Sequence, residues 1–258
     1  VESRDEVAEL VKMSAELDLI IPRGSNELVQ YIQKNAQVPV LGHADGICHV
    51  FLDEAADEAK SLEVTLDSKL DYPAVCNASE TLLVHQNFSD ELLADILRKM
   101  QDAGVELRVC AETEKRLQNF PQLKLKKAVE EDWKTEYIDL ILSVKSVKSA
   151  EEAVQHINQY GSKHTDTIVT ENSELAEWFM NTVDAAGVFW NASTRFADGF
   201  RYGLGAEVGV STGKIHARGP VGLEGLVIYK YKLYGNGHGV GRYSNAKREL
   251  LHENIVVE

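Results

Sequence analysis

Apolar and polar positions along the chain alternate between two kinds of spacing, one typical of helices and the other of short buried strands. A helical pattern over residues 5–13 is followed by a short apolar run over 17–21. A second helical pattern covers 26–33, and a second apolar run covers 38–41. Strand, turn, helix and strand in this order are typical of a parallel sheet with crossover helices. The pattern therefore predicts an α/β fold.

The same alternation continues through the middle of the chain. Ser89 and Ser149 are suited to cap helices, since a serine hydroxyl accepts a hydrogen bond from a backbone N–H of the first turn. The spacing predicts helices at 55–66, 90–103, 150–157 and 175–180, and strands at 81–84, 105–109, 138–144, 167–169 and 187–190.

The pattern changes after residue 191. From Gly199 to Gly225 glycines are frequent and apolar clusters few, which predicts an ordered loop region that faces a ligand. A strand-like pattern returns over Leu226–Leu233, where Lys230 and Lys232 are typical of an edge or intersubunit strand. The last twenty residues are polar, and we expect them to be loosely held.

Composition and charge exclude several classes of protein and of binding partner. The 258 residues are 44% apolar and 26% charged, which excludes a disordered, collagen-like or coiled-coil chain. Lys and Arg total 27 against 41 Asp and Glu, a formal net charge of −14 that would repel nucleic acid and an anionic bilayer. No apolar run is long enough for a membrane span, and the first residues lack the plan of a signal peptide. We therefore expect an intracellular protein with a small-molecule substrate and no membrane insertion.

The three cysteines form no CxxC motif and indicate a reducing compartment. Cys76 follows a turn with Pro73 and precedes a predicted strand, a place from which a thiolate can face a cleft as a nucleophile. Its backbone N–H, with a neighbouring amide donor, would hold an oxyanion. The alternative is a small buried hydrophobe, since no His or Lys beside it in the sequence signals activation. Cys48 and Cys110 lie in apolar or strand-like runs and are expected in the core.

Other polar motifs leave two interpretations open. The turn over residues 21–26 joins a predicted strand to a predicted helix, so it is either an anion site or an ordinary capped turn. Glu136 is either a ribose-binding carboxylate or a solvated strand end, and Arg195 is either an anion clamp or a surface arginine. His43 and His49 flank Cys48, but without a second ligand cluster no metal site is predicted.

Seven stretches in fixed order give the chain a family resemblance. They resemble the reductase module of glutamate-5-semialdehyde dehydrogenase (γ-glutamyl phosphate reductase), in the aldehyde dehydrogenase superfamily, most of all the version fused to glutamate 5-kinase in eukaryotic Δ1-pyrroline-5-carboxylate synthase. The stretches are IIPRGS (20–25), VPVLGHADGIC (38–48), YPAVCNA (72–78), YGSKHTD (160–166), FWNASTR (189–195), GLGAEVGVS (203–211) and HARGPVGLEGL (216–226).

The resemblance implies an activity and a role for each candidate. The activity is NADPH-dependent reduction of L-glutamyl 5-phosphate to L-glutamate 5-semialdehyde through a cysteine thioester, in proline biosynthesis. The implied residues are Cys76 and Asn77 for catalysis, Gly24, Ser25 and Glu136 for the NADP cofactor, and Asn191 and Arg195 for the substrate.

The resemblance also implies an organisation in three parts. Residues 1–43 are expected to be the C-terminal part of a partial Rossmann-type nucleotide-binding domain, 44–225 a catalytic domain, and 226–258 an oligomerisation strand and tail. We therefore expect a fragment of a longer enzyme that forms a homo-oligomer, in the cytoplasm or alternatively in mitochondria. The competing interpretations are a non-catalytic assembly module of the same fold and a different acyl-phosphate or aldehyde reductase.

Overall fold

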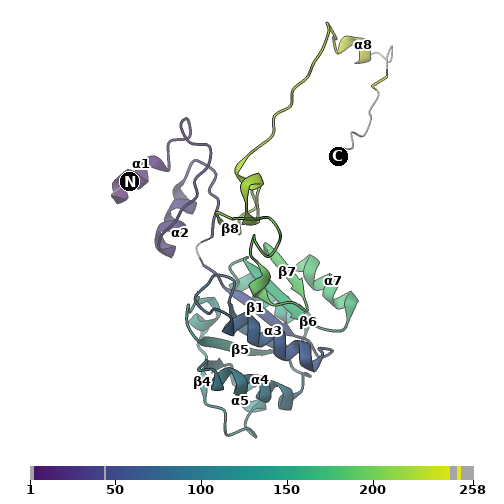
Figure 1. Cartoon of the computed structure of the whole chain (residues 1–258). Helices are drawn as coiled ribbons and strands as arrows, with labels where there is room; N and C mark the ends of the chain where they lie inside the picture. The colour runs from purple at the N-terminus through teal and green to yellow at the C-terminus, as the bar shows by residue number, and fades with distance from the viewer. Residues whose placement is uncertain (1–2, 44, 245–248, 251–258) are drawn as a thin grey trace. The chain divides into compact units, whose positions relative to one another are not determined.

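The computed structural model describes residues 3–43, 45–244 and 249–250. Contacts between residues divide the chain into two units, Val1–Leu226 and Val227–Glu258. The first unit contains the sheets, and the described residues of the second form a short helix, α8 (Gly241–Ser244), after an extended segment (Figure 1).

A seven-stranded parallel sheet is the centre of the first unit. Its strands lie in the order β4-β3-β5-β2-β1-β6-β7, and each neighbouring pair is parallel. This arrangement confirms the α/β fold that the apolar pattern predicted. The strands are β1 (Cys48–Leu52), β2 (Ser79–His85), β3 (Glu106–Val109), β4 (Leu125–Lys127), β5 (Ile141–Val147), β6 (Thr165–Val169) and β7 (Gly187–Trp190).

Helices connect these strands, and serines cap two of them as the sequence predicted. Ser89 Oγ accepts from the N–H of Leu92 at 3.2 Å, and Ser149 Oγ accepts from the N–H of Glu152 at 3.4 Å. The helices of the first unit are α1 (Arg4–Leu10), α2 (Asn26–Asn35), α3 (Glu58–Leu70), α4 (Asp90–Asp102), α5 (Ala111–Arg116), α6 (Ala150–Tyr160) and α7 (Ser173–Thr182), with 3-10 turns η1 (Glu130–Lys134), η2 (Thr194–Phe196) and η3 (Leu223–Leu226).

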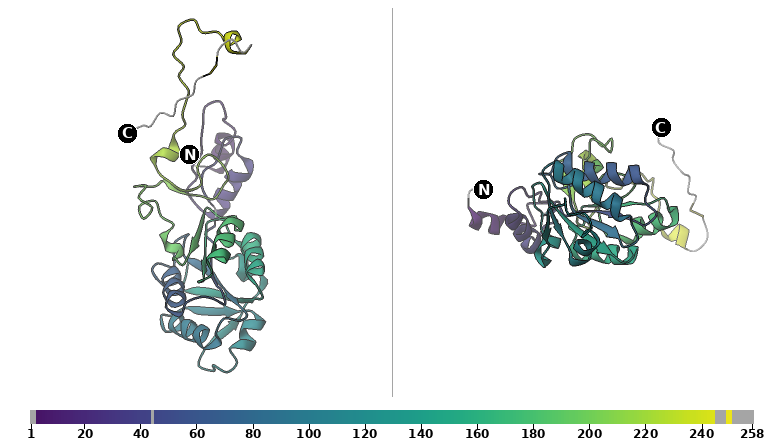
Figure 2. Two further views of the ribbon diagram at one scale, coloured as in Figure 1. Left: turned by 90° about the vertical axis from the view of Figure 1, so that its right-hand side faces the viewer. Right: turned by 90° about the horizontal axis from the view of Figure 1, so that it is seen from below.

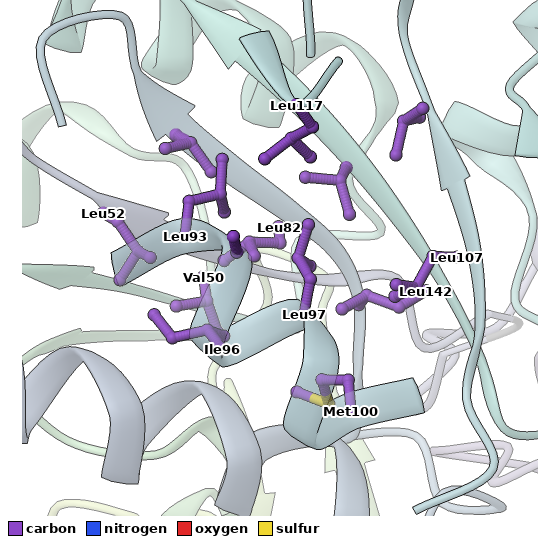
Figure 3. Close-up of a cluster of buried hydrophobic side chains, with 14 of the residues drawn as sticks. Val50, Leu52, Leu82, Leu93, Ile96, Leu97, Met100, Leu107, Leu117 and Leu142 are labelled. Atoms are coloured by element: carbon purple, nitrogen blue, oxygen red, sulfur yellow. The ribbon is translucent and has the colours of Figure 1, made fainter. Parts of the chain in front are cut away.

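The alternation of side chains along the strands builds a core on each face of the sheet. On one face Val50 and Leu82 pack with α4, a cluster that Figure 3 shows. On the other face Phe51 and Leu83 pack with α6 and α7. The left view of Figure 2 shows the strands between these two layers of helices. Consecutive strand residues face opposite sides, so apolar runs without polar interruption are expected in a sheet covered on both faces.

The first 43 residues form a smaller cluster around α1 and α2. Val11, Ile32 and Val38 are buried there. The two strands that the sequence predicted over 17–21 and 38–41 reduce to a single parallel bridge between Ile20 and Val40. Two short strands that pair only with each other form a marginal ladder, which explains the reduction.

Leu226–Leu233 pairs with no strand among the described residues of this chain, so the predicted intersubunit strand stays a prediction. Two further predictions are wrong. The glycine-rich region contains an antiparallel hairpin, β8 (Gly209–Ser211) and β9 (Gly219–Val221), rather than loop alone. Cys110 is only half-buried and caps α5, where its sulfur accepts from the N–H of Thr113, instead of lying in the core.

None of the helices among the described residues is long and apolar enough to cross a membrane. The three-part division at residues 43 and 225 stays a prediction. The contacts join 1–43 to the sheet within one unit, and they separate the chain only after Leu226.

Candidate active site

The candidate residues gather where the strands begin. His43 and Gly46 precede β1, Cys76 precedes β2, Glu136 precedes β5, and His164 immediately precedes β6. Because neighbouring strands run parallel, their amino ends meet at one edge of the sheet. Ligands of open parallel sheets usually bind at the carboxyl edge, so this site lies at the opposite edge from the common one.

The backbone of Cys76 is held against the segment that enters β1. A Cβ on Gly46 would overlap the backbone of Cys76, so only glycine permits this approach. Cys48, buried at the start of β1, donates from its Sγ to the carbonyl of Cys76 at 3.3 Å. The Cys76 side chain itself is half-buried and not sealed in the core.

A buried ion pair closes the base of the loop that carries Cys76. Lys69 near the end of α3 donates to Glu80 in β2 at 2.6 Å, and both side chains are buried. Burial raises the pKa of Glu80 to about 7, an effect that Lys69 opposes, and burial lowers the pKa of Lys69. A pair in this position fixes where the loop leaves the helix and enters the strand.

Asn77 and Arg195 are brought together beside this loop. Arg195 donates to Asn77 Oδ1, and Asn77 Nδ2 donates to the carbonyl of Ala197 at 3.1 Å. Thr194 Oγ1 donates to the carbonyl of Asn77 at 2.7 Å, and Arg195 also pairs with Asp71 at 3.0 Å. Both ends of the Asn77 amide are therefore engaged within the protein.

The charges around Cys76 favour its neutral thiol. Burial raises the pKa of the Cys76 thiol to about 11, and the carboxylates of Glu136 and Glu207 add to the rise. Arg195 and the backbone N–H of Cys76 act in the opposite direction. That N–H lies beside the sulfur, where a transition-state oxyanion would form.

Two imidazoles face the thiol. Nitrogen atoms of His43 and His164 and the sulfur of Cys76 all lie within 4.8 Å of one another. The two rings meet edge to face, with centroids 5.0 Å apart. Burial, with a contribution from His43, lowers the pKa of His164 to about 3, so this ring is neutral. No local pattern in the sequence signals this cluster, because three distant segments supply it.

The predicted cofactor residues also lie close together. Ser25 caps α2 by accepting from the N–H of Leu28 at 3.4 Å, and Gly24 before it has a φ of +149°. Asn26 in the first turn donates to Asp45 at 2.6 Å and to Glu136 at 3.4 Å. The N-terminus of α2 and the Glu136 carboxylate are thus neighbours.

Asn191 is a predicted substrate residue that lies away from the thiol. Its side chain accepts from the N–H of Thr170 and donates to the carbonyl of Thr170, both at 3.0 Å. Thr170 follows the carboxyl end of β6, six residues beyond His164, which at strand rise is roughly 20 Å away. Asn191 itself has a φ of +52° and turns the chain back toward the Cys76 loop.

Curated relatives match nearly all of the chain. It is 55% identical over 254 residues to a γ-glutamyl phosphate reductase of Acetivibrio thermocellus, covering 98% of this chain and 58% of the relative. It is 57% identical over 242 residues to γ-glutamyl phosphate reductase 1 of a Synechocystis species, covering 94% and 54%. The chain therefore spans somewhat more than half the length of these relatives. No protein-family model matches it.

Comparison with solved structures identifies the fold of the chain. The chain superimposes on a γ-glutamyl phosphate reductase of Thermotoga maritima with a TM-score of 0.86 and 43% identity, over 92% of this chain and 56% of that one. An acetylating aldehyde dehydrogenase of Geobacillus thermoglucosidasius gives a TM-score of 0.62 at 20% identity, over 91% and 61%. The fold is that of the aldehyde dehydrogenases.

Proposed function

We propose that this chain, which over the part that it spans belongs to the γ-glutamyl phosphate reductase family, carries the thiol of an enzyme that reduces L-glutamyl 5-phosphate to L-glutamate 5-semialdehyde in proline biosynthesis. The observation that carries the proposal is the half-buried thiol of Cys76, which lies at the amino edge of the sheet. Glu136 lies near it, and Asn26 links Glu136 to the start of α2. An acyl group and a nucleotide would meet at this edge.

In the proposed reaction Cys76 forms a thioester. Its sulfur attacks the γ-carbonyl carbon, the thiol proton leaves to a nearby base, and the backbone N–H of Cys76 stabilises the oxyanion. The carbon–oxygen bond to phosphate then breaks and phosphate leaves. After reduction of the thioester carbon, the carbon–sulfur bond breaks, the semialdehyde leaves and Cys76 regains its proton.

The start of α2 and the neighbouring Glu136 fit a nicotinamide dinucleotide. The N-terminus of α2 offers backbone N–H groups for a pyrophosphate, with Gly24 and Ser25 at the turn. The Glu136 carboxylate offers acceptors for ribose hydroxyls, and the Asn26 amide lies next to it. When bound, NADPH supplies the hydride.

We propose separate roles for Arg195 and Asn191, which the resemblance assigned to the substrate. Arg195 lies beside the Cys76 loop, where it opposes the rise of the thiol pKa, and Asn77 and Asp71 hold its guanidinium in place. Asn191 would have to give up both bonds to Thr170 to bind substrate, so its proposed role is to position the segment that returns to Arg195.

The test is reduction of NADP⁺ by pyrroline-5-carboxylate and phosphate, the reverse reaction. It is run with this chain and with a chain extended to the length of its relatives. Turnover in either chain that Cys76→Ser abolishes and Cys110→Ser retains would support the proposal. Turnover that survives Cys76→Ser would overturn it.

The same assay separates the competing functions. Absence of turnover in both chains would favour a non-catalytic assembly module. Preference for an aspartyl substrate would point to a different acyl-phosphate reductase, and preference for NAD⁺ would correct the cofactor.

A further inference from the structure

The cluster of His43, Cys76 and His164 has the composition of a metal site. Its three ligand atoms lie within 4.8 Å of one another, in a part of the protein that is half-buried at His43 and Cys76 and fully buried at His164. Two imidazoles and one thiol are the ligand types that Zn²⁺ prefers.

The hydrogen bonds of the two rings indicate which nitrogen atoms keep a lone pair for a metal ion. His43 Nδ1 lies 2.8 Å from the carbonyl of Val210. A carbonyl only accepts, so Nδ1 carries the proton and Nε2 keeps its lone pair. A metal-binding histidine is commonly fixed in this way by a backbone carbonyl on its other nitrogen.

His164 supplies the second, independent observation. Its Nδ1 lies 2.9 Å from the hydroxyl of Thr165, while its Nε2 is buried and has no hydrogen-bond partner among the described residues. A buried polar nitrogen without a partner is unfavourable by roughly 1–3 kcal/mol. A metal ion bound to this nitrogen would remove that cost.

We propose that Nε2 of His43, Nε2 of His164 and Sγ of Cys76 form a three-ligand binding site for a thiophilic divalent cation, Zn²⁺. Three atoms within 4.8 Å of one another have a common point about 2.8 Å or less from each, and Zn²⁺ requires about 2.0–2.3 Å. Side-chain rotations that move these atoms by less than about 1 Å therefore complete the site. A water molecule would fill the fourth position.

Binding exchanges a proton for a metal ion without any redox step. The Cys76 thiol releases its proton to solvent and its sulfur binds Zn²⁺, while the two imidazoles bind through the lone pairs of their Nε2 atoms. The sulfur can then no longer attack a carbonyl carbon. Inhibition of the reductase by Zn²⁺ follows only if the proposed function is correct, whereas the binding itself does not depend on it.

The experiment measures Zn²⁺ binding directly, without substrate or cofactor. Zn²⁺ is titrated into the full chain against a chelating indicator, and Co²⁺ is used as a spectroscopic substitute. We expect one ion per chain, a sulfur-to-cobalt charge-transfer band, and binding weakened at least about tenfold by Cys76→Ser or His43→Gln. Cys110→Ser, which changes a half-buried thiol outside the cluster, should bind like the wild type.

A second measurement tests the site in the wild type and so does not depend on whether the Cys76 variant folds. Iodoacetamide labelling of Cys76 and Cys110 is followed by mass spectrometry with and without Zn²⁺. In the wild type, Zn²⁺ should protect Cys76 from labelling. In His43→Gln most of that protection should be lost, and Cys110 should be labelled in every case. No bound Zn²⁺, or equal protection of Cys76 in the wild type and in His43→Gln, would overturn the site.

Discussion

At the scale of single residues, the packing of Gly46 against Cys76 makes a specific prediction. Gly46→Ala would force the backbone of the thiol loop away from β1, because the added methyl group overlaps the Cys76 carbonyl and Cα. We expect a loss of about 1–3 kcal/mol in the free energy of unfolding, the usual range for overpacking, together with a changed rate of Cys76 alkylation. Urea unfolding and labelling kinetics check both.

A glycine with room around it provides the matched control. A methyl group added at Gly213 would have only the Ser211 hydroxyl within 4 Å, and the backbone there has no positive φ. Gly213→Ala should leave stability and alkylation unchanged. Equal effects of the two substitutions would contradict the steric explanation for Gly46.

Residue roles were predictable only where a family motif marked them. The local sequence of Cys76 favoured a small buried hydrophobe over a nucleophile, and only the resemblance over YPAVCNA implied the nucleophile. His43 was compared with Cys48 and His49, its neighbours in the sequence. Its actual neighbours, Cys76 and His164, follow from the parallel pairing of β1 with β2 and β6, which no local pattern reveals.

At the scale of elements, one carboxylate links the β8–β9 hairpin to the sheet. Asp184, between α7 and β7, pairs with Lys214 at 2.9 Å and Arg218 at 3.0 Å from the hairpin connection, and with Lys163 at 3.3 Å before β6. These cations, Lys214 first, lower the pKa of Asp184 to about 2. The folded protein therefore holds this carboxylate ionised more firmly than the unfolded chain does.

The contribution of Asp184 to the free energy of unfolding should be lost at low pH. A lowered folded-state pKa stabilises the protein above about pH 4, and that contribution disappears as the pH falls toward 2. Because the cations are partly solvated, we expect Asp184→Asn to reduce the free energy of unfolding by about 1 kcal/mol at pH 7, with the difference shrinking between pH 4 and pH 2. Urea unfolding of both proteins across this range checks it. A difference in the free energy of unfolding that stays constant between pH 4 and pH 2 would contradict the lowered pKa of Asp184.

Elements were predictable where local chemistry decides them. The serine caps and apolar faces of α4 and α6 are local, and both helices begin where the sequence predicted. The predicted strands at 17–21 and 226–233 needed partners elsewhere, and within the described residues the first forms one bridge and the second pairs with nothing. An apolar run shows that a strand is possible, but a neighbouring edge decides whether it forms.

At the scale of the whole molecule, the segment after Leu226 predicts self-association. Tyr229, Tyr231 and Leu233, which alternate with Lys230 and Lys232, are between 81% and 97% exposed. Tyrosines and lysines alternate over residues 229–232, the period of a strand with one apolar face. An exposed apolar patch of this kind marks an interaction surface, and an extended segment gains backbone hydrogen bonds by joining a sheet edge. We therefore expect a second copy of the chain to supply that edge.

A charge on the apolar face should break the assembly. Tyr229→Asp with Tyr231→Asp would bury carboxylates in the interface, so sedimentation should show the wild type as an oligomer and the double variant as a monomer at the same concentration. Lys230→Gln with Lys232→Gln changes the other face and should leave the oligomer intact, because those side chains point away from the apolar contact. A wild type that stays monomeric at high concentration, or a double Asp variant that still assembles, would show that this segment is not the interface.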